Sequence, residues 1–300
     1  MWQMRFEVFR VLAVAALLLG AKSADGHQLW LETAAVGRTG ESHPLHVCWG
    51  SPGNKETEAG LARQQGKLSA YWARPGGERE VLDLGMGSDS FTASFTPNEP
   101  GYHRVGGEIQ IGILTREFHG IAAGTRLVMY GTSSVRVECS EQGLDECSEQ
   151  GLDGCSEQGL DSPLGLDLEI IPTRSPRDLR PGDLVEVKVL FQGEPVGDQL
   201  TEVSLSTMGP ESFSDRAQER RMRWSVTREA DPATGTVRFP LIVPGQHVFY
   251  LQYMDETPGR YEGDLQFTTD YSRLSRGDTY ERTLYICTFT LDVTDNATLP

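Results

Sequence analysis

The histidines and cysteines are the residues of this chain that are best suited to metal chemistry, because imidazole nitrogen and thiolate sulfur bind divalent transition metals. The sequence contains His27, His43, His46, His103, His119 and His247, together with five cysteines. His27 stands out because removal of a leader before it would expose an α-amine beside an imidazole. Cu(II), Ni(II) and Co(II) favour such nitrogen donors. An α-amine with a pKa of about 8 also deprotonates readily under a metal.

One residue does not hold a metal well, so further ligands must come from the fold. His103 is the leading partner, because it follows a Pro-Gly turn at the start of a predicted strand. His46 and Cys48 lie two residues apart on another predicted strand and therefore share a face, where they could chelate a soft metal. His43 has the other parity and cannot join His46. The sequence thus predicts a metal site drawn from His27, His103, His46 and Cys48.

Each candidate also has an ordinary structural interpretation. His27 could be no more than a chain terminus. His103 and His247 occupy equivalent turns, so we expect at least one of them to pack a turn. His46 would then be a solvated side chain and Cys48 a small hydrophobic residue. Three tryptophans on strand-like segments are expected in the core rather than on a ligand platform, namely Trp30, Trp49 and Trp72.

The N-terminus reads as a signal peptide over residues 1–26. Arg5 and Arg10 supply positive charge, and the apolar run 11–21 is too short to span a bilayer. Cleavage after Gly26 would make His27 the first residue, and cleavage after Ser23 would leave three residues before it. We therefore expect a periplasmic or secreted protein.

Composition narrows the possible partners. The chain has 43 Asp and Glu against 27 Lys and Arg, a formal net charge of -16, which argues against binding to nucleic acid. No apolar stretch after residue 26 is long enough to span a bilayer, so we expect no membrane insertion after processing.

An octapeptide beginning CSEQGLD occurs three times over residues 139–162 and varies only in its last position. It has few apolar residues and no basic ones, so we expect a solvated acidic linker. Each copy contains one cysteine, at Cys139, Cys147 and Cys155. We expect these cysteines to have been copied with a duplicated spacer rather than to form a soft-metal site, because zinc sites use tighter cysteine spacing. Five cysteines, an odd number, do not suggest a disulfide scaffold.

The linker separates two halves, 27–138 and 163–300, that share a pattern of strands and turns. Apolar residues alternate over 43–49 and 185–191, and the segments 91–95 and 236–239 each lead to a Pro-Gly turn followed by a histidine. This predicts an all-β protein of two consecutive β-sandwich domains of immunoglobulin or transthyretin type. Short helices are expected only at 55–65 and 211–221.

A series of segments carries a family resemblance. They are HQLWLE at 27–32, CWG at 48–50, FTP at 95–97, PGYH at 100–103, LDLEIIP at 166–172, LRPGD at 179–183, VLFQGEPV at 189–196 and TGT at 234–236. The chain thereby resembles a poorly characterised secreted bacterial family related to the periplasmic component of nickel and cobalt uptake systems. It departs from that pattern at Thr33, where a proline is common, and in the octapeptide insert. The resemblance implies handling of a metal ion outside the cytoplasmic membrane, with a membrane transporter as partner; together with the nitrogen-donor chemistry of His27, the expected ion is nickel, cobalt or copper.

No enzyme motif accompanies these features. The sequence has no serine nucleophile elbow, HExxH, CxxC or glycine-rich phosphate loop, so we expect a binding protein rather than an enzyme. Two other functions stay open. One is a metal-free adhesion or carbohydrate-binding module, which would align aromatic residues on an exposed face. The other is a copper enzyme built on His27.

Overall fold

The structure is a computed structural model in which residues 27–51, 54–139, 158–175, 179–196, 202–208, 226–241 and 244–293 are described. The expected signal peptide, repeat residues 140–157 and the expected helix at 211–221 lie outside these ranges. Within them the chain is nearly all β, as the sequence predicts. None of the helices in this part of the chain could cross a membrane.

An 11-stranded sheet forms the middle of the molecule. Its strands in spatial order are β15 Val226–Glu229, β14 Glu202–Met208, β17 Gly245–Asp255, β22 Arg282–Val293, β10 Thr125–Glu138, β9 Gly101–Leu114, β20 Ser272–Leu274 and β19 Phe267–Thr268. Three further strands join it, β2 Val36–Arg38 beside β10, β5 Leu68–Ala73 beside β9 and β6 Arg79–Leu82 beside β5. Because β10 and β22 pair in parallel, this sheet runs through both halves of the chain.

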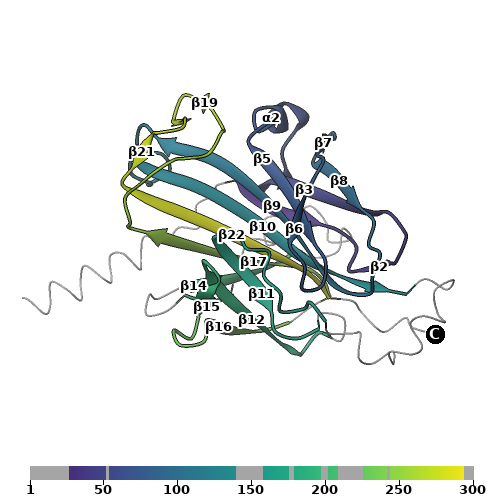
Figure 1. Cartoon of the computed structure of the whole chain (residues 1–300). Coiled ribbons are helices and arrows are strands. Elements are labelled where there is room, and N and C mark those ends of the chain that lie inside the picture. The colour runs from purple at the N-terminus through teal and green to yellow at the C-terminus, as the bar shows by residue number, and fades with distance from the viewer. Residues whose placement is uncertain are drawn as a thin grey trace, which may run out of the picture.

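Smaller sheets complete the molecule (Figure 1). One contains β1 Gln28–Glu32, β3 His43–Ser51, β8 Phe91–Phe95 and β7 Gly85–Met86, with β4 Asn54–Lys55 beside β3. Another contains β11 Leu168–Pro172, β12 Leu184–Phe191 and β13 Glu194–Pro195, with β16 Thr236–Pro240 beside β12. The pair β18 Gly259–Arg260 and β21 Thr279–Tyr280 is separate.

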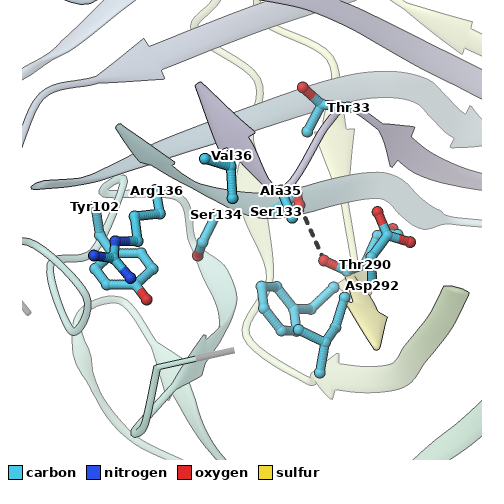
Figure 2. A pocket seen from close by; sticks show the side chains of 11 residues that line it. Thr33, Ala35, Val36, Tyr102, Ser133, Ser134, Arg136, Thr290 and Asp292 are labelled. Atoms are coloured by element: carbon cyan, nitrogen blue, oxygen red, sulfur yellow. Dashed lines mark hydrogen bonds between the residues drawn. The ribbon is translucent and has the colours of Figure 1, made fainter. Parts of the chain in front are cut away.

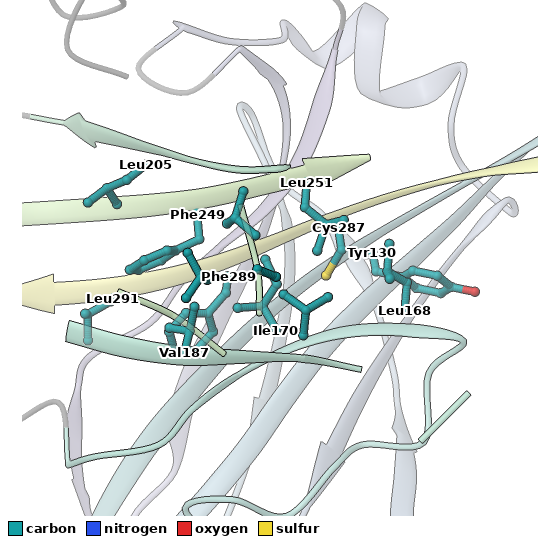
Figure 3. Close-up of a cluster of buried hydrophobic side chains, with 14 of the residues drawn as sticks. Tyr130, Leu168, Ile170, Val187, Leu205, Phe249, Leu251, Cys287, Phe289 and Leu291 are labelled. Carbon is teal, nitrogen blue, oxygen red and sulfur yellow. The ribbon is translucent and has the colours of Figure 1, made fainter. Parts of the chain in front are cut away.

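The two larger of these sheets cover opposite faces of the central sheet. Successive side chains of a strand point to opposite faces, and on β22 Leu284 and Ile286 join the core under β1, β3 and β8. Cys287 and Phe289 join the core against β11, β12 and β16 (Figure 3). The result is three β layers with two large hydrophobic cores and a small third cluster around Ile113, Tyr261 and Leu274, and the middle strands are buried on both faces.

The local predictions agree closely with these elements. The expected strands correspond to β3, β8, β12 and β16. The two Pro-Gly turns start β9 and β17, where Gly101 and Gly245 have φ values of 126° and 118° that favour glycine. The helix expected at 55–65 is the shorter α2 Glu58–Ala62, capped by Thr57, whose side chain accepts a hydrogen bond from the Gly60 N–H.

The end of the octapeptide repeat belongs to the fold, which corrects the expected extent of the linker. The Gln158 carbonyl accepts a hydrogen bond of 2.8 Å from the Tyr102 N–H, and Leu160 is only 5% exposed. Gly159 and Leu160 of the third copy are buried, whereas Gln158 and Asp161 are exposed, so the repeat ends as a turn attached to the fold.

Candidate functional site

His27 lies at an exposed corner of the small β1–β3 sheet. The pairing of Gln28 with Gly50 places it beside the end of β3, and the Glu56 N–H donates to the Trp49 carbonyl at 2.9 Å. His27 Nε2 consequently contacts the Glu56 carboxylate, and the imidazole stacks on the Trp49 indole with ring centroids 5.3 Å apart. The hydrogen bond with His27 lowers the pKa of the Glu56 carboxyl. The His27 side chain is 48% exposed, so this ring is both oriented and accessible.

His103, in contrast, is a core residue. Its side chain is completely buried, Nδ1 accepts a hydrogen bond of 3.0 Å from the Trp72 indole N–H, and Nε2 donates to the Glu99 carbonyl at 2.9 Å. Burial lowers the pKa of this histidine. Both ring nitrogens are engaged, so metal ligation by His103 would cost two buried hydrogen bonds. The contacts of His103 are with Trp72, Phe95 and Glu99, whereas those of His27 are with Trp49 and Glu56.

His46 and Cys48 share a face of β3, as the strand parity predicts, but their surroundings differ. His46 is half-buried and its Nδ1 lies 3.2 Å from the Ser90 hydroxyl. Cys48 is completely buried, and burial strongly raises the pKa of its thiol. Because the thiolate is the metal ligand, Cys48 is a poor partner for His46 in this state.

Among the side chains that the structure describes, no three His, Cys, Asp or Glu residues are grouped to hold a metal ion. The α-amine of a processed chain is not a side chain and lies outside that set.

A cleft that the sequence does not reveal lies between the small sheet and the end of β22. Glu32, His46 and Asp292 line an open hollow of about 350 Å³. It adjoins a cavity of about 70 Å³ lined in part by Arg136, and Thr33 and Asp292 border both (Figure 2). Burial, and then the nearby Glu32 carboxylate, raise the pKa of Asp292. Local sequence carries no signal for this cleft, since β1 and β22 come from opposite ends of the folded chain.

Comparison with known proteins gives a family but no activity. A family model described as "Domain of unknown function (DUF4198)" matches residues 24–255. No curated protein matches the chain. A crystal structure of a DUF4785 family protein from Legionella pneumophila is 10% identical, with a TM-score of 0.24. The match covers 74% of this chain and 50% of that one, so this chain spans about half the length of that structure.

Proposed function

We propose that this chain, which belongs to the DUF4198 family, binds a divalent transition metal ion as cargo outside the cytoplasmic membrane, with His27 as the first mature residue and principal ligand. The observation that carries the proposal is the fixed orientation of an accessible imidazole at the expected processing point. Glu56 holds Nε2 and Trp49 supports the ring face.

The proposed mode of metal binding depends on which ring nitrogen of His27 is available to the metal. With Nε2 directed at Glu56, Nδ1 is the ring nitrogen that closes a six-membered chelate with the α-amine of the same residue. A carboxylate that accepts the other ring N–H fixes the tautomer of a ligating histidine and raises its basicity. Glu56 is suited to that positioning role. The two nitrogen donors favour Cu(II), Ni(II) and Co(II) over harder ions.

One further feature supports export. Residues 1–26 have the charge and apolar run of a signal peptide. The resemblance to the periplasmic component of nickel and cobalt uptake systems adds a membrane transporter as the proposed recipient of the ion.

Calorimetric titration of Cu(II) and Ni(II) into secreted protein with its native start tests the proposal. Adding Gly-Ser before His27, or substituting His27→Ala, should each weaken binding at least 10-fold, because each removes a nitrogen donor. Glu56→Gln should weaken it about 10-fold through loss of orientation. His119→Asn is the matched control, since His119 is exposed with a φ of 49° that asparagine tolerates. A first residue other than His27, or an affinity equal to that of the parent in both the extended and the His27→Ala proteins, would refute the chelate.

The metal-free carbohydrate-binding module has less support. Such modules present aromatic rings to solvent, whereas the exposed large hydrophobic residues within the described ranges are Val36, Val81, Met86 and Leu184. The three tryptophans Trp30, Trp49 and Trp72 are buried, as the sequence predicts.

A further inference from the structure

β10 and β22 separate near their ends and leave a fork in the central sheet. They pair in parallel as far as Ser133 and Thr290. Beyond this point β10 pairs with β2, starting at Arg136 and Val36, whereas β22 stays paired only with β17. The 70 Å³ cavity lies in this fork, with Ser133 and Thr290 joined at its base (Figure 2).

The fork cavity contains a polar group that the fold leaves unsatisfied. Thr290 is only 3% exposed, yet its hydroxyl has no hydrogen-bond partner among the described residues. An unpartnered buried hydroxyl costs about 1–3 kcal/mol. Its place in the wall of a cavity indicates a ligand atom as the missing partner.

Arg136 gives this cavity a cationic group. Its side chain lines the cavity and is 18% exposed, and its Nη2 lies 3.8 Å from the Glu138 carboxylate. That distance is too long for a hydrogen bond. The guanidinium is therefore placed to donate to an anionic ligand, and carboxylates match its paired N–H groups.

The opposite side of the cavity is acidic and its walls are apolar. Asp292 borders both the cavity and the wider cleft, where Glu32 is its neighbour. Ala35, Val36 and Leu291 supply hydrocarbon surface. A cavity of about 70 Å³ corresponds to roughly five water positions, which suits the head group of a small molecule whose remainder reaches the cleft.

We propose that the fork cavity binds a small apolar α-amino acid as its zwitterion. The ligand carboxylate accepts hydrogen bonds from Arg136 and the Thr290 hydroxyl, the ammonium lies at Asp292, and the side chain lies against Val36 and Leu291. An ammonium at this position also offsets the repulsion between Asp292 and Glu32, which contributes to the raised pKa of Asp292. This site is independent of His27.

Calorimetric titration with L-valine, isovalerate and isobutylamine tests the proposal, because the last two lack the amine and the carboxylate in turn. The experiment uses the His27→Ala protein in metal-free buffer, so that valine cannot bind through a metal at the other site. Valine should bind at least 10-fold more tightly than either analogue, since each analogue leaves one charged group of the site unpaired.

Arg136→Gln and Thr290→Val should each weaken valine binding at least 5-fold, whereas the control Arg74→Gln, at an exposed ion pair, should not. Thr290→Val should raise the Tm of the ligand-free protein, because it removes a buried hydroxyl that has no hydrogen-bond partner in the described structure. Isovalerate binding as tightly as valine would overturn the zwitterion assignment. Absence of valine binding in the parent, or unchanged affinity in both variants, would overturn the site.

Discussion

Arg104 Nη2 donates a hydrogen bond of 3.1 Å to the carbonyl oxygen of Ile170, across the boundary between the two halves of the sequence. Arg104 lies on β9 and Ile170 on β11, and the arginine is only 1% exposed. Its Nη1 donates a hydrogen bond of 3.0 Å to the Ser134 hydroxyl. Burial lowers the pKa of Arg104, and the negative charge of Glu169 partly counteracts this decrease. The halves are therefore connected by a buried cation as well as by the shared sheet.

Substitution Arg104→Met should destabilise the protein by about 3 kcal/mol, because it keeps most of the volume but leaves the Ile170 carbonyl without its donor and removes the buried positive charge near the Glu169 carboxylate. Urea denaturation measures the change. Arg74→Met, at an exposed ion pair, is the matched control and should change stability by less than about 0.5 kcal/mol. The double variant Arg104→Met with Glu169→Gln should lose less than the sum of the single variants. Equal stability of the Arg104 and Arg74 variants would contradict this role.

The sequence predicts the strands better than their arrangement. Alternation over 43–49 and 185–191 reveals β3 and β12, because each has one face in a core. β22 is buried along nearly its whole length, yet only Leu284–Cys287 is a continuous apolar run, and threonines occupy buried positions on the other half of the strand. The pattern therefore does not show that both faces of β22 are covered. Its parallel pairing with β10 depends on tertiary contacts that no local pattern encodes.

For the candidate site residues too, the sequence indicates individual residues but not the contacts that the fold gives them. His27 is marked in the sequence by its position after a signal peptide, but its orientation by Glu56 depends on how β4 returns along β3. His103 looks like a ligand in the sequence because its turn is visible and its partner Trp72, on another strand, is not. The Arg136–Thr290–Asp292 cavity arises from the fork and has no local signal.

Protonation of buried histidines should make this protein acid-sensitive. Burial lowers the pKa of both His43 and His103, so the folded state favours their neutral forms. Their contribution to stability is therefore complete above the unfolded pKa of about 6.5 and is lost as the pH falls below it toward the lower folded values. The Tm should decrease from pH 7 to pH 5, and His103→Gln should reduce the slope of that decrease.

His119→Asn is the control for this measurement, because His119 is exposed and its substitution should leave the slope unchanged. His103→Gln should also lower the Tm at pH 7, since it disturbs the stack of Trp72, Phe95 and His103, while metal affinity at His27 stays at the parent value. A steep loss of metal affinity at unchanged Tm would instead make His103 a ligand.

Asp292→Asn should stabilise the protein at neutral pH. The pKa of Asp292 is raised in the folded state, so its ionisation costs the folded state more than the unfolded one. That cost is absent below the unfolded pKa of about 3.9 and appears as the pH rises through the folded value. Urea denaturation at pH 7 should show a gain for Asp292→Asn, and at pH 3 the variant and parent should be equal. A loss at pH 7 would show that the carboxylate is satisfied after all.

Gly131 should not tolerate a side chain, because β1 crosses β10 at this position. A Cβ added to Gly131 would lie 3.1 Å from the Leu29 carbonyl oxygen and 3.2 Å from the Trp30 Cα. Both neighbours are backbone atoms of β1. The Thr288 hydroxyl donates a hydrogen bond of 2.5 Å to the same Leu29 carbonyl, so β1 cannot move away from Gly131 without losing that bond. Gly131→Ala should therefore lower the free energy of unfolding by about 1–3 kcal/mol, measured by urea denaturation.

Gly77→Ala is the matched control, since the nearest neighbour of an added Cβ there is the Arg74 Cβ, 3.3 Å away on an exposed turn. Gly131→Ala as stable as Gly77→Ala would mean that β1 has room to shift away from β10, and His27 would then sit on a movable strand rather than a fixed one.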